Sequence, residues 1–270
     1  MTYDNVLSID TVTAKLRAAA NQFNIHTVLE FMEEHRGLRF GKIHLLLGST
    51  GCGKSTLVRT MLLDCILGSQ DIRTGIYLSE ETLTDFYVEF STNELDDYTK
   101  QKLSVISEQD ESVKTGKEFF KKLESLVEQK CRVIFIDNIT TSRLYENSKP
   151  NQQGDIIDYL KRFATKHNVA LVVVAHTSKG SISSNNRLID VEDVRGSGAL
   201  PNAAPIAWTI QRVDYGSLRA TVVRVAKNRG YTVKYQWFLA IYHAKNKVFC
   251  TFKPVEFEKI KDIFKQRDKI

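Results

Sequence analysis

The sequence predicts an α/β fold in which helices flank a mainly parallel central sheet and antiparallel C-terminal strands extend it. Short runs such as 43–47, 133–136 and 169–175 are apolar throughout, which is typical of strands buried on both faces. Longer amphipathic segments separate these runs, and this alternation favours helices on both sides of a parallel sheet. After about residue 206 the helical segments stop, and strand-like runs follow one another.

The individual elements follow from the spacing of apolar residues, which recur every three or four positions in helices and form short unbroken runs in buried strands. The first part of the chain is expected to contain strands over 43–47, 75–78, 133–136 and 169–175, and helices over 54–67, 82–90, 115–130 and 152–167. The last part is expected to contain strands over 220–226, 234–243 and 247–252. Two polar stretches, 140–154 and 177–193, are expected to be long loops, which in compact domains are usually functional.

We expect three parts along the chain. Apolar residues at helical spacing over 11–35 predict a helix or a broken helix pair, so residues 1–36 form an N-terminal helical segment. The α/β pattern makes residues 37–253 the core, and residues 254–270 are a basic tail. A chain of 270 residues accommodates one such core without a second large domain.

Composition excludes several classes of protein. Hydrophobic residues make up 42% and charged residues 26%, as in globular proteins, so a disordered or collagen-like chain is excluded. The longest apolar runs are far shorter than the roughly 20 residues that cross a membrane. The first residues lack the features of a secretion signal, so we expect a cytoplasmic protein with no membrane partner. Four widely separated cysteines argue against a zinc site or a disulfide framework.

The net charge of +6 is concentrated near the C-terminus. From residue 215 onward thirteen Lys and Arg residues stand against four acidic residues, and the preceding part is slightly acidic. A basic segment can bind the phosphates of nucleic acid, but a solvated tail explains the same charge. Charge alone therefore leaves both interpretations open.

The most specific motif is a phosphate-binding loop. Residues Gly48, Ser49, Thr50, Gly51, Cys52, Gly53, Lys54, Ser55 and Thr56 fit the pattern GxxxxGK[ST] and lie between an expected strand and an expected helix. The glycines let backbone N–H groups turn toward a phosphate, and the helix N-terminus adds partial positive charge. Lys54 would bridge the β- and γ-phosphates, and the Ser55 hydroxyl would bind Mg²⁺. The motif therefore predicts binding of ATP, or another nucleoside triphosphate, together with Mg²⁺.

Polar residues at the ends of three other strands complete the predicted site. Asp137 ends the run 133–136 and is expected to hold Mg²⁺. Glu80 and Glu81 follow the strand 75–78, where one carboxylate could activate water and the other could favour a helix start; we favour Glu80 as the base. His176 ends the next strand, where it could sense the γ-phosphate.

Several motifs in register resemble the RecA-type core of the DnaB-like replicative helicases, most closely the helicase half of phage primase-helicases and mitochondrial Twinkle. The resemblance covers about residues 37–253. The segments that carry it are GSTGCGKSTLVRT at 48–60, YLSEET at 77–82, IFIDN at 134–138, LVVVAH at 171–176, DVRGSGAL at 193–200 and VAKNR at 225–229. It implies a RecA-like P-loop NTPase core with Glu80 as catalytic glutamate, Asp137 as magnesium ligand and His176 as γ-phosphate sensor.

The resemblance also implies residues that act between subunits or on the base. Arg229, with Lys227 beside it, matches the arginine finger that reaches the nucleotide of a neighbouring subunit. Arg212 and Tyr242 match residues that pack on the nucleotide base. Such a finger implies a homo-oligomer, expected to be a hexameric ring, with the N-terminal helical segment linking neighbours.

In the family, the loop after the sensor histidine holds single-stranded DNA. The resemblance therefore implies DNA contacts from Lys179, Arg187, Arg195 and Gly196. A disordered surface loop without a role in DNA binding would have the same polar sequence. The expected function is an ATP-dependent DNA helicase of replication, acting in a host cytoplasm if a phage encodes it. A separate primase or polymerase would be a partner. A recombination ATPase on the same core and an ATP-gated adaptor or loader of replication proteins remain alternatives.

Overall fold

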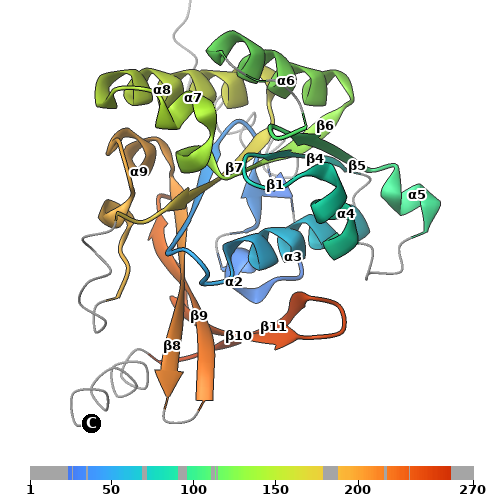
Figure 1. Ribbon diagram of the computed structural model, residues 1–270. Coiled ribbons are helices and arrows are strands. Elements are labelled where there is room, and N and C mark those ends of the chain that lie inside the picture. The colour runs from blue at the N-terminus through green and yellow to red at the C-terminus, as the bar shows by residue number, and fades with distance from the viewer. Residues whose placement is uncertain are drawn as a thin grey trace, which may run out of the picture.

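The computed structural model describes residues 24–25, 27–34, 36–68, 72–90, 96–110, 113, 115–178, 188–215, 218–230 and 232–256. A nine-stranded sheet forms its centre, with the order β11-β10-β9-β8-β3-β7-β6-β4-β5 (Figure 1). The strands are β3 (Ile43–Gly48), β4 (Arg73–Leu78), β5 (Leu103–Ser107), β6 (Cys131–Asp137), β7 (Ala170–His176), β8 (Ile206–Tyr215), β9 (Leu218–Asn228), β10 (Trp237–His243) and β11 (Val248–Pro254). This arrangement confirms the predicted fold class.

The sheet is parallel in its first part and antiparallel in its last. Strand β3 lies between β7 and β8 and is parallel to both, and β6, β4 and β5 continue the parallel part. Strands β8, β9, β10 and β11 pair antiparallel in chain order. All six residues of β3 are buried, which explains why its sequence is a continuous apolar run.

Helices cover both faces of the sheet and give three layers (Figure 1). The helices α2 (Glu30–Glu33), α3 (Lys54–Leu67) and α4 (Leu83–Phe90) pack on one face, and α6 (Gly116–Glu128), α8 (Pro150–His167) and α9 (Ala199–Ala203) pack on the other. Alternate residues of β3 supply the two cores: Leu46 belongs to the first, and Leu45 and Leu47 belong to the second.

Short elements link these layers. They are β1 (Asn24–Ile25), which pairs antiparallel with β2 (Leu38–Arg39), α5 (Asp97–Lys100), η1 (Ile139–Thr141), α7 (Arg143–Glu146) and η3 (Val191–Asp193). Ile25, Phe31 and Met32 are buried in the first core, so Ile25 and α2 pack on the same chain's sheet. Among the described residues, no helix is long and apolar enough to cross a membrane.

The predicted elements agree with most of the structure. The strands over 43–47, 75–78, 133–136 and 169–175 and the helices over 54–67, 82–90, 115–130 and 152–167 are confirmed within a few residues. The expected loop over 140–154 is wrong, because α7 and the first turn of α8 lie within it. Ser142 caps α7 with its side chain, and Pro150 occupies the first turn of α8.

Two further expectations are only partly covered by the structure. Of the helix expected over 11–35, residues 11–23, 26 and 35 lie outside the described residues, and the described remainder contains β1 and the short helix α2. Of the loop expected over 177–193, residues 179–187 lie outside, and η3 occupies its last residues. The boundaries of the three expected parts of the chain stay predictions.

Candidate nucleotide site

The phosphate-binding loop connects β3 to α3, and its glycines adopt backbone conformations that other residues avoid. Gly51 has φ +73° and Gly53 has φ +105°. A Cβ at Gly48 would lie 2.6 Å from Cys52 Sγ and 2.7 Å from the Ile210 carbonyl oxygen. Gly53 caps α3 without a side-chain hydrogen bond, so the first N–H groups of this 14-residue helix can bind an anion.

Lys54 lies in this loop and is buried, with 5% of its surface exposed. Its Nζ donates a hydrogen bond to the Ser49 carbonyl oxygen at 2.7 Å. Burial lowers the pKa of Lys54, and the nearby carboxylates of Asp137 and Glu80 oppose that shift. The Lys54 ammonium group can bind phosphate oxygens when these replace the Ser49 carbonyl oxygen as its partner.

Asp137 ends β6 directly opposite Leu78 of β4, so it lies at the carboxyl edge of the sheet. Burial raises the pKa of Asp137 to about 6, and a hydrogen bond from Ser55 partly offsets the effect. Glu81 and Glu80 raise it further by repulsion. A carboxylate beside a hydroxyl is the kind of hard oxygen donor set that Mg²⁺ prefers. Ser55 and Asp137 therefore fit a magnesium site.

The two glutamates after β4 differ in what they contact. Glu81 forms an ion pair with Arg59 of α3, whose Nη2 lies 2.8 Å from Glu81 Oε2. Glu80 has a half-exposed side chain, and its Oε1 accepts a hydrogen bond from Asn138 Nδ2 at 3.0 Å. Glu80 also lines the nucleotide pocket, whereas Glu81 is held by Arg59. This difference supports the choice of Glu80 as the base.

His176 ends β7 beside Glu80 and Asn138. Its Nε2 lies 4.0 Å from Glu80 Oε1 and 3.2 Å from Asn138 Nδ2. Burial lowers the pKa of His176, and the nearby Lys54 lowers it further, so the neutral ring is favoured near neutral pH. A neutral imidazole has one nitrogen that can accept a hydrogen bond from the asparagine amide.

A cavity of about 280 Å³ joins these side chains at the carboxyl ends of β3, β6 and β7. The residues that line it are Thr50, Gly51, Gly53, Lys54, Ser55, Thr56, Glu80, Asp137, Asn138, His176 and Arg212. The structure therefore brings Arg212, an exposed residue of β8, to the same pocket as the phosphate-binding loop. The roles assigned to these residues stay predictions.

Tyr242 lies one aromatic ring away from the phosphate-binding loop. Its half-exposed ring meets Phe249 of β11 edge-on, with centroids 6.0 Å apart. A Cβ at Gly53 would lie 3.3 Å from the Phe249 ring, and Phe249 N donates to Thr60 Oγ1 at 3.0 Å. The turn of the loop thus packs against β11, and Tyr242 contacts the Phe249 ring that lies there.

Lys227 and Arg229 lie toward the other end of the sheet. Asn228 pairs with Ile206, which pairs with His44, whereas Gly48 of the phosphate-binding loop pairs with Ile210. His44 and Gly48 are four residues apart on β3, which corresponds to about 13 Å along the strand. Lys227 Nζ donates to the Pro201 carbonyl oxygen, and Arg229 is exposed. The structure therefore does not bring these two residues to the nucleotide pocket of their own chain.

The expected DNA-binding residues are only partly described. Lys179 and Arg187 lie outside the described residues. Arg195 N donates to the His176 carbonyl oxygen at 2.8 Å, and the Arg195 side chain pairs with Glu146 at 3.3 Å. The segment around Arg195 is therefore joined directly to the end of β7.

Gly196 follows with φ +95°, and a Cβ there would lie 2.8 Å from Tyr145 and Gln153. Close packing alone explains this glycine. Its expected contact with DNA stays a prediction.

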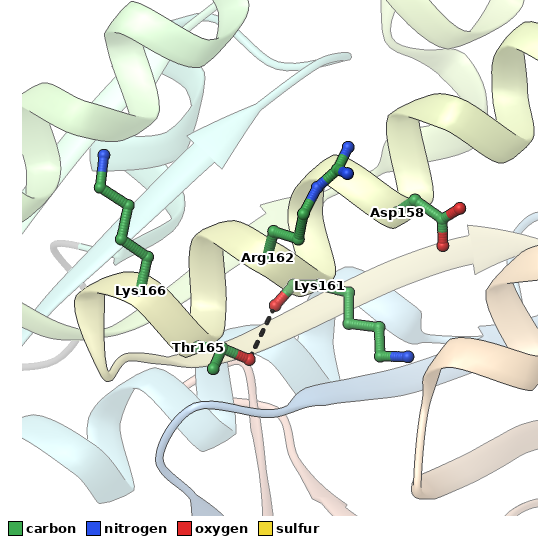
Figure 2. Close-up of a pocket in the computed structure, with 5 residues that line it drawn as sticks. All are labelled: Asp158, Lys161, Arg162, Thr165 and Lys166. Carbon is green, nitrogen blue, oxygen red and sulfur yellow. Dashed lines mark hydrogen bonds between the residues drawn. The ribbon is translucent and has the colours of Figure 1, made fainter. Parts of the chain in front are cut away.

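A second hollow, of about 420 Å³, lies on α8 and carries none of the predicted site residues (Figure 2). Its lining includes Asp158, Lys161, Arg162, Thr165 and Lys166. Figure 2 shows that the side chains of Lys161 and Lys166 point in different directions. Thr165 Oγ1 has the Lys161 carbonyl oxygen at 3.0 Å and the Gly41 carbonyl oxygen at 3.2 Å as acceptors, so that hydroxyl is already bound to the main chain. The charged groups do not converge on a ligand.

A family model for an AAA domain matches residues 34–181, more than half of the chain. The chain belongs to this AAA family. The matched residues include the phosphate-binding loop, Glu80, Asp137 and His176, so the AAA domain is a P-loop ATPase. Membership implies nucleotide binding together with Mg²⁺. A comparison with curated proteins finds no significant match.

Sequence reasoning missed three residues of this AAA domain whose side chains join neighbouring segments, and one of them, Asn138, lines the nucleotide pocket. Asn138 follows Asp137 at the carboxyl edge of the sheet, and its position there could have identified it. Glu108 has 1% of its surface exposed, accepts from Tyr77 Oη at 3.0 Å and from Arg143 N at 2.7 Å, and follows the unpredicted strand β5. Arg59 is on α3, and nothing in its local sequence indicates a partner after β4.

Proposed function

We propose that the chain is an ATP-dependent DNA helicase of the DnaB-like type, which forms a ring and moves along single-stranded DNA during replication. The observation that carries the proposal is the position of Arg229. It is exposed and directly follows Asn228, which lies beside Ile206 and His44, about 13 Å of strand from the end of β3. A guanidinium there serves catalysis only in the nucleotide site of another copy, so the proposal requires an assembly.

Within one site, the side chains divide the work of hydrolysis. The amides at the start of α3 and Lys54 bind the phosphates and orient the γ-phosphoryl group for in-line attack. Glu80 accepts the proton of the attacking water, because its half-exposed carboxylate lines the cavity. Ser55 and Asp137 would hold Mg²⁺, which neutralises charge on the phosphate oxygens.

Arg229 of a neighbouring copy completes the site. Arginine fingers supply about 10³ to 10⁵ in rate, or roughly 4 to 7 kcal/mol of transition-state stabilisation. An isolated copy is therefore nearly inactive in this mechanism. Loss of the γ-phosphate would be transmitted from His176 to the following segment, which His176 joins through the hydrogen bond from Arg195 N.

Two measurements test this proposal together. The first is ATPase rate per subunit against protein concentration, with and without single-stranded DNA. The second is displacement of the annealed strand of a forked duplex. We expect the rate to rise steeply with concentration, to increase with DNA, and to accompany strand displacement.

A rate per subunit that is independent of both concentration and DNA would refute the motor. Pairing of homologous strands without displacement would identify a recombination ATPase instead. Nucleotide-controlled binding of other replication proteins, with the fork left intact, would identify an adaptor. The mass of the assembly with a non-hydrolysable ATP analogue and an oligonucleotide would give the number of subunits, which we propose is six.

A further inference from the structure

Asn138 lies between the two groups that the proposed function places on the γ-phosphate side of the site. Its Nδ2 donates to Glu80 Oε1 at 3.0 Å and lies 3.2 Å from His176 Nε2 and 3.4 Å from Nδ1. A side-chain amide carries two hydrogens, so one group can serve a carboxylate and a neutral imidazole at the same time. We infer that Asn138 is a positioning residue that couples Glu80 to His176. This inference rests on the proposed roles of both groups.

The oxygen of the same amide is fixed. Asn138 Oδ1 accepts from Thr140 Oγ1 at 2.8 Å and from Thr141 N at 3.1 Å, which caps η1. Rotation of the amide would break both bonds and leave buried donors unpaired, because Asn138 is 2% exposed. Because Oδ1 is fixed, the two hydrogens on Nδ2 must point toward Glu80 and His176.

Thr140 extends this network to the backbone of β7. Its Oγ1 accepts from His176 N at 3.0 Å while it donates to Asn138 Oδ1. Both the ring and the main chain of His176 are thus joined to the amide that holds Glu80. A displacement of His176 removes one partner of the amide, and the bond to Glu80 changes in strength and direction.

Glu80 depends on this bond because, within the described part of the chain, the other neighbour of its carboxylate is His176 Nε2, 4.0 Å away. It is half-exposed, while its neighbour Glu81 is held by Arg59. A carboxylate that orients water must be held within a few tenths of an ångström of its working position. Asn138 supplies that restraint, and the restraint depends on the position of His176 because the same amide nitrogen contacts both side chains.

The variant that tests the coupling is Asn138→Ser. Serine is a good cap and keeps an acceptor for η1, but it lacks the amide that reaches Glu80 and His176. Thr141→Ala is the matched control, because among the described residues its hydroxyl donates to the main-chain carbonyl of Asn138, at 3.4 Å, and not to the amide. Thermal unfolding of both variants verifies that they fold.

We expect Asn138→Ser to lower kcat by about ten- to a hundredfold, the range for loss of a hydrogen bond to a charged group. KM for ATP should change less than about twofold, since the phosphate-binding loop is intact. Adding His176→Ala to Asn138→Ser should cost less than the two separate losses predict, because both remove one coupling. Thr141→Ala should match the parent protein.

A readout without nucleotide separates this inference from the proposed function. In protein labelled with ¹⁵N-histidine, Asn138→Ser should shift the imidazole signals of His176, identified by their loss in His176→Ala, and Thr141→Ala should not. Unchanged His176 signals, or a kcat equal to that of the parent, would overturn the coupling. Absence of DNA stimulation or unwinding in the parent protein would refute the helicase alone, and the NMR and kcat results would still decide the role of Asn138.

Discussion

The guanidinium of Arg39 holds the segment that carries Arg229. Its Nη1 donates to the Arg229 carbonyl oxygen at 2.7 Å, and its Nη2 donates to Asn228 Oδ1 at 3.1 Å. The Arg229 amide is also bound, because it donates to the Pro205 carbonyl oxygen at 2.8 Å. The backbone of Arg229 is thus fixed on both sides while its side chain is exposed.

Arg229→Ala should abolish most ATPase activity of the assembled protein, by about 10³-fold or more, and leave ATP binding intact. Lys54→Ala should lose ATP binding instead. Mixed assemblies of the two variants should regain activity, because an intact loop can then meet an intact Arg229. Mixtures as inactive as either variant alone would exclude action between copies.

Arg39→Ala should lower kcat by about tenfold, less than Arg229→Ala, because Arg229, the proposed arginine finger, stays present but its segment loses two hydrogen bonds. Arg132→Ala is the control, since Arg132 stacks over Phe40 and is exposed. Steady-state ATPase assays of the assembled proteins compare them. Equal losses of kcat in both variants would show that the effect does not come from the hydrogen bonds between Arg39 and the segment of Arg229.

Glu80→Gln and Glu81→Gln form a matched pair of adjacent substitutions. Glu80→Gln should lower kcat by about 10²- to 10⁴-fold with ATP binding unchanged, because the amide cannot accept the proton. Glu81→Gln should keep kcat within a few-fold and lower stability by about 1 kcal/mol through loss of charge in the pair with Arg59. Single-turnover ATP hydrolysis and thermal unfolding measure the two effects, and the reverse result would exchange their roles.

Asp64 of α3 should make stability depend on pH. Burial raises the pKa of Asp64 from 3.8 to about 6, although Oδ1 accepts a hydrogen bond from Val28 N at 3.0 Å. Between about pH 4 and 6 the folded state keeps a proton that the unfolded state loses, so this group lowers stability as pH rises. The effect is fully present above pH 6.

Asp64→Asn removes this titration and keeps an acceptor for Val28. Relative to the parent, we expect it to gain about 1–2 kcal/mol between pH 4 and pH 7, after allowance for solvent screening of this partly exposed group. Urea unfolding at several pH values measures the difference. A difference that is constant with pH would contradict the raised pKa.

Gly196→Ala should destabilise the fold by about 1–3 kcal/mol, because the added Cβ meets Tyr145 and Gln153 at 2.8 Å and the backbone has φ +95°. Gly198→Ala is the control two residues away, where no atom of the described residues, apart from the chain neighbours, lies within 4 Å of the added Cβ. We expect it to change stability by about 0.5 kcal/mol or less. Equal melting temperatures for the two variants would contradict the packing argument.

The sequence predicts those parts of the site that depend on single strands. Strands β3, β6 and β7 are continuous apolar runs, so their carboxyl ends, and with them Gly48, Asp137 and His176, could be placed at one edge. Strand β5 could not be predicted, because Ser104 and Ser107 interrupt its apolar residues and it lies at the edge of the sheet. Glu108 directly follows β5, so its position could not be predicted either.

Contacts between elements could not be predicted either. The pair Arg59–Glu81 joins α3 to the segment after β4, and the bond from Asn138 to Glu80 joins the ends of β6 and β4. Neither spacing nor residue type indicates which of two adjacent glutamates such contacts hold. That choice depends on the packing of helix on sheet.

The contact of Phe249 with Gly53 has a consequence for biosynthesis. The phosphate-binding loop is translated early. The Phe249 ring that packs against its turn at Gly53 is translated about two hundred residues later. A nascent chain on the ribosome therefore carries the whole phosphate-binding motif long before it can form the finished cradle. We expect the turn of this loop to reach its final packing only after β11 has left the exit tunnel and joined the sheet.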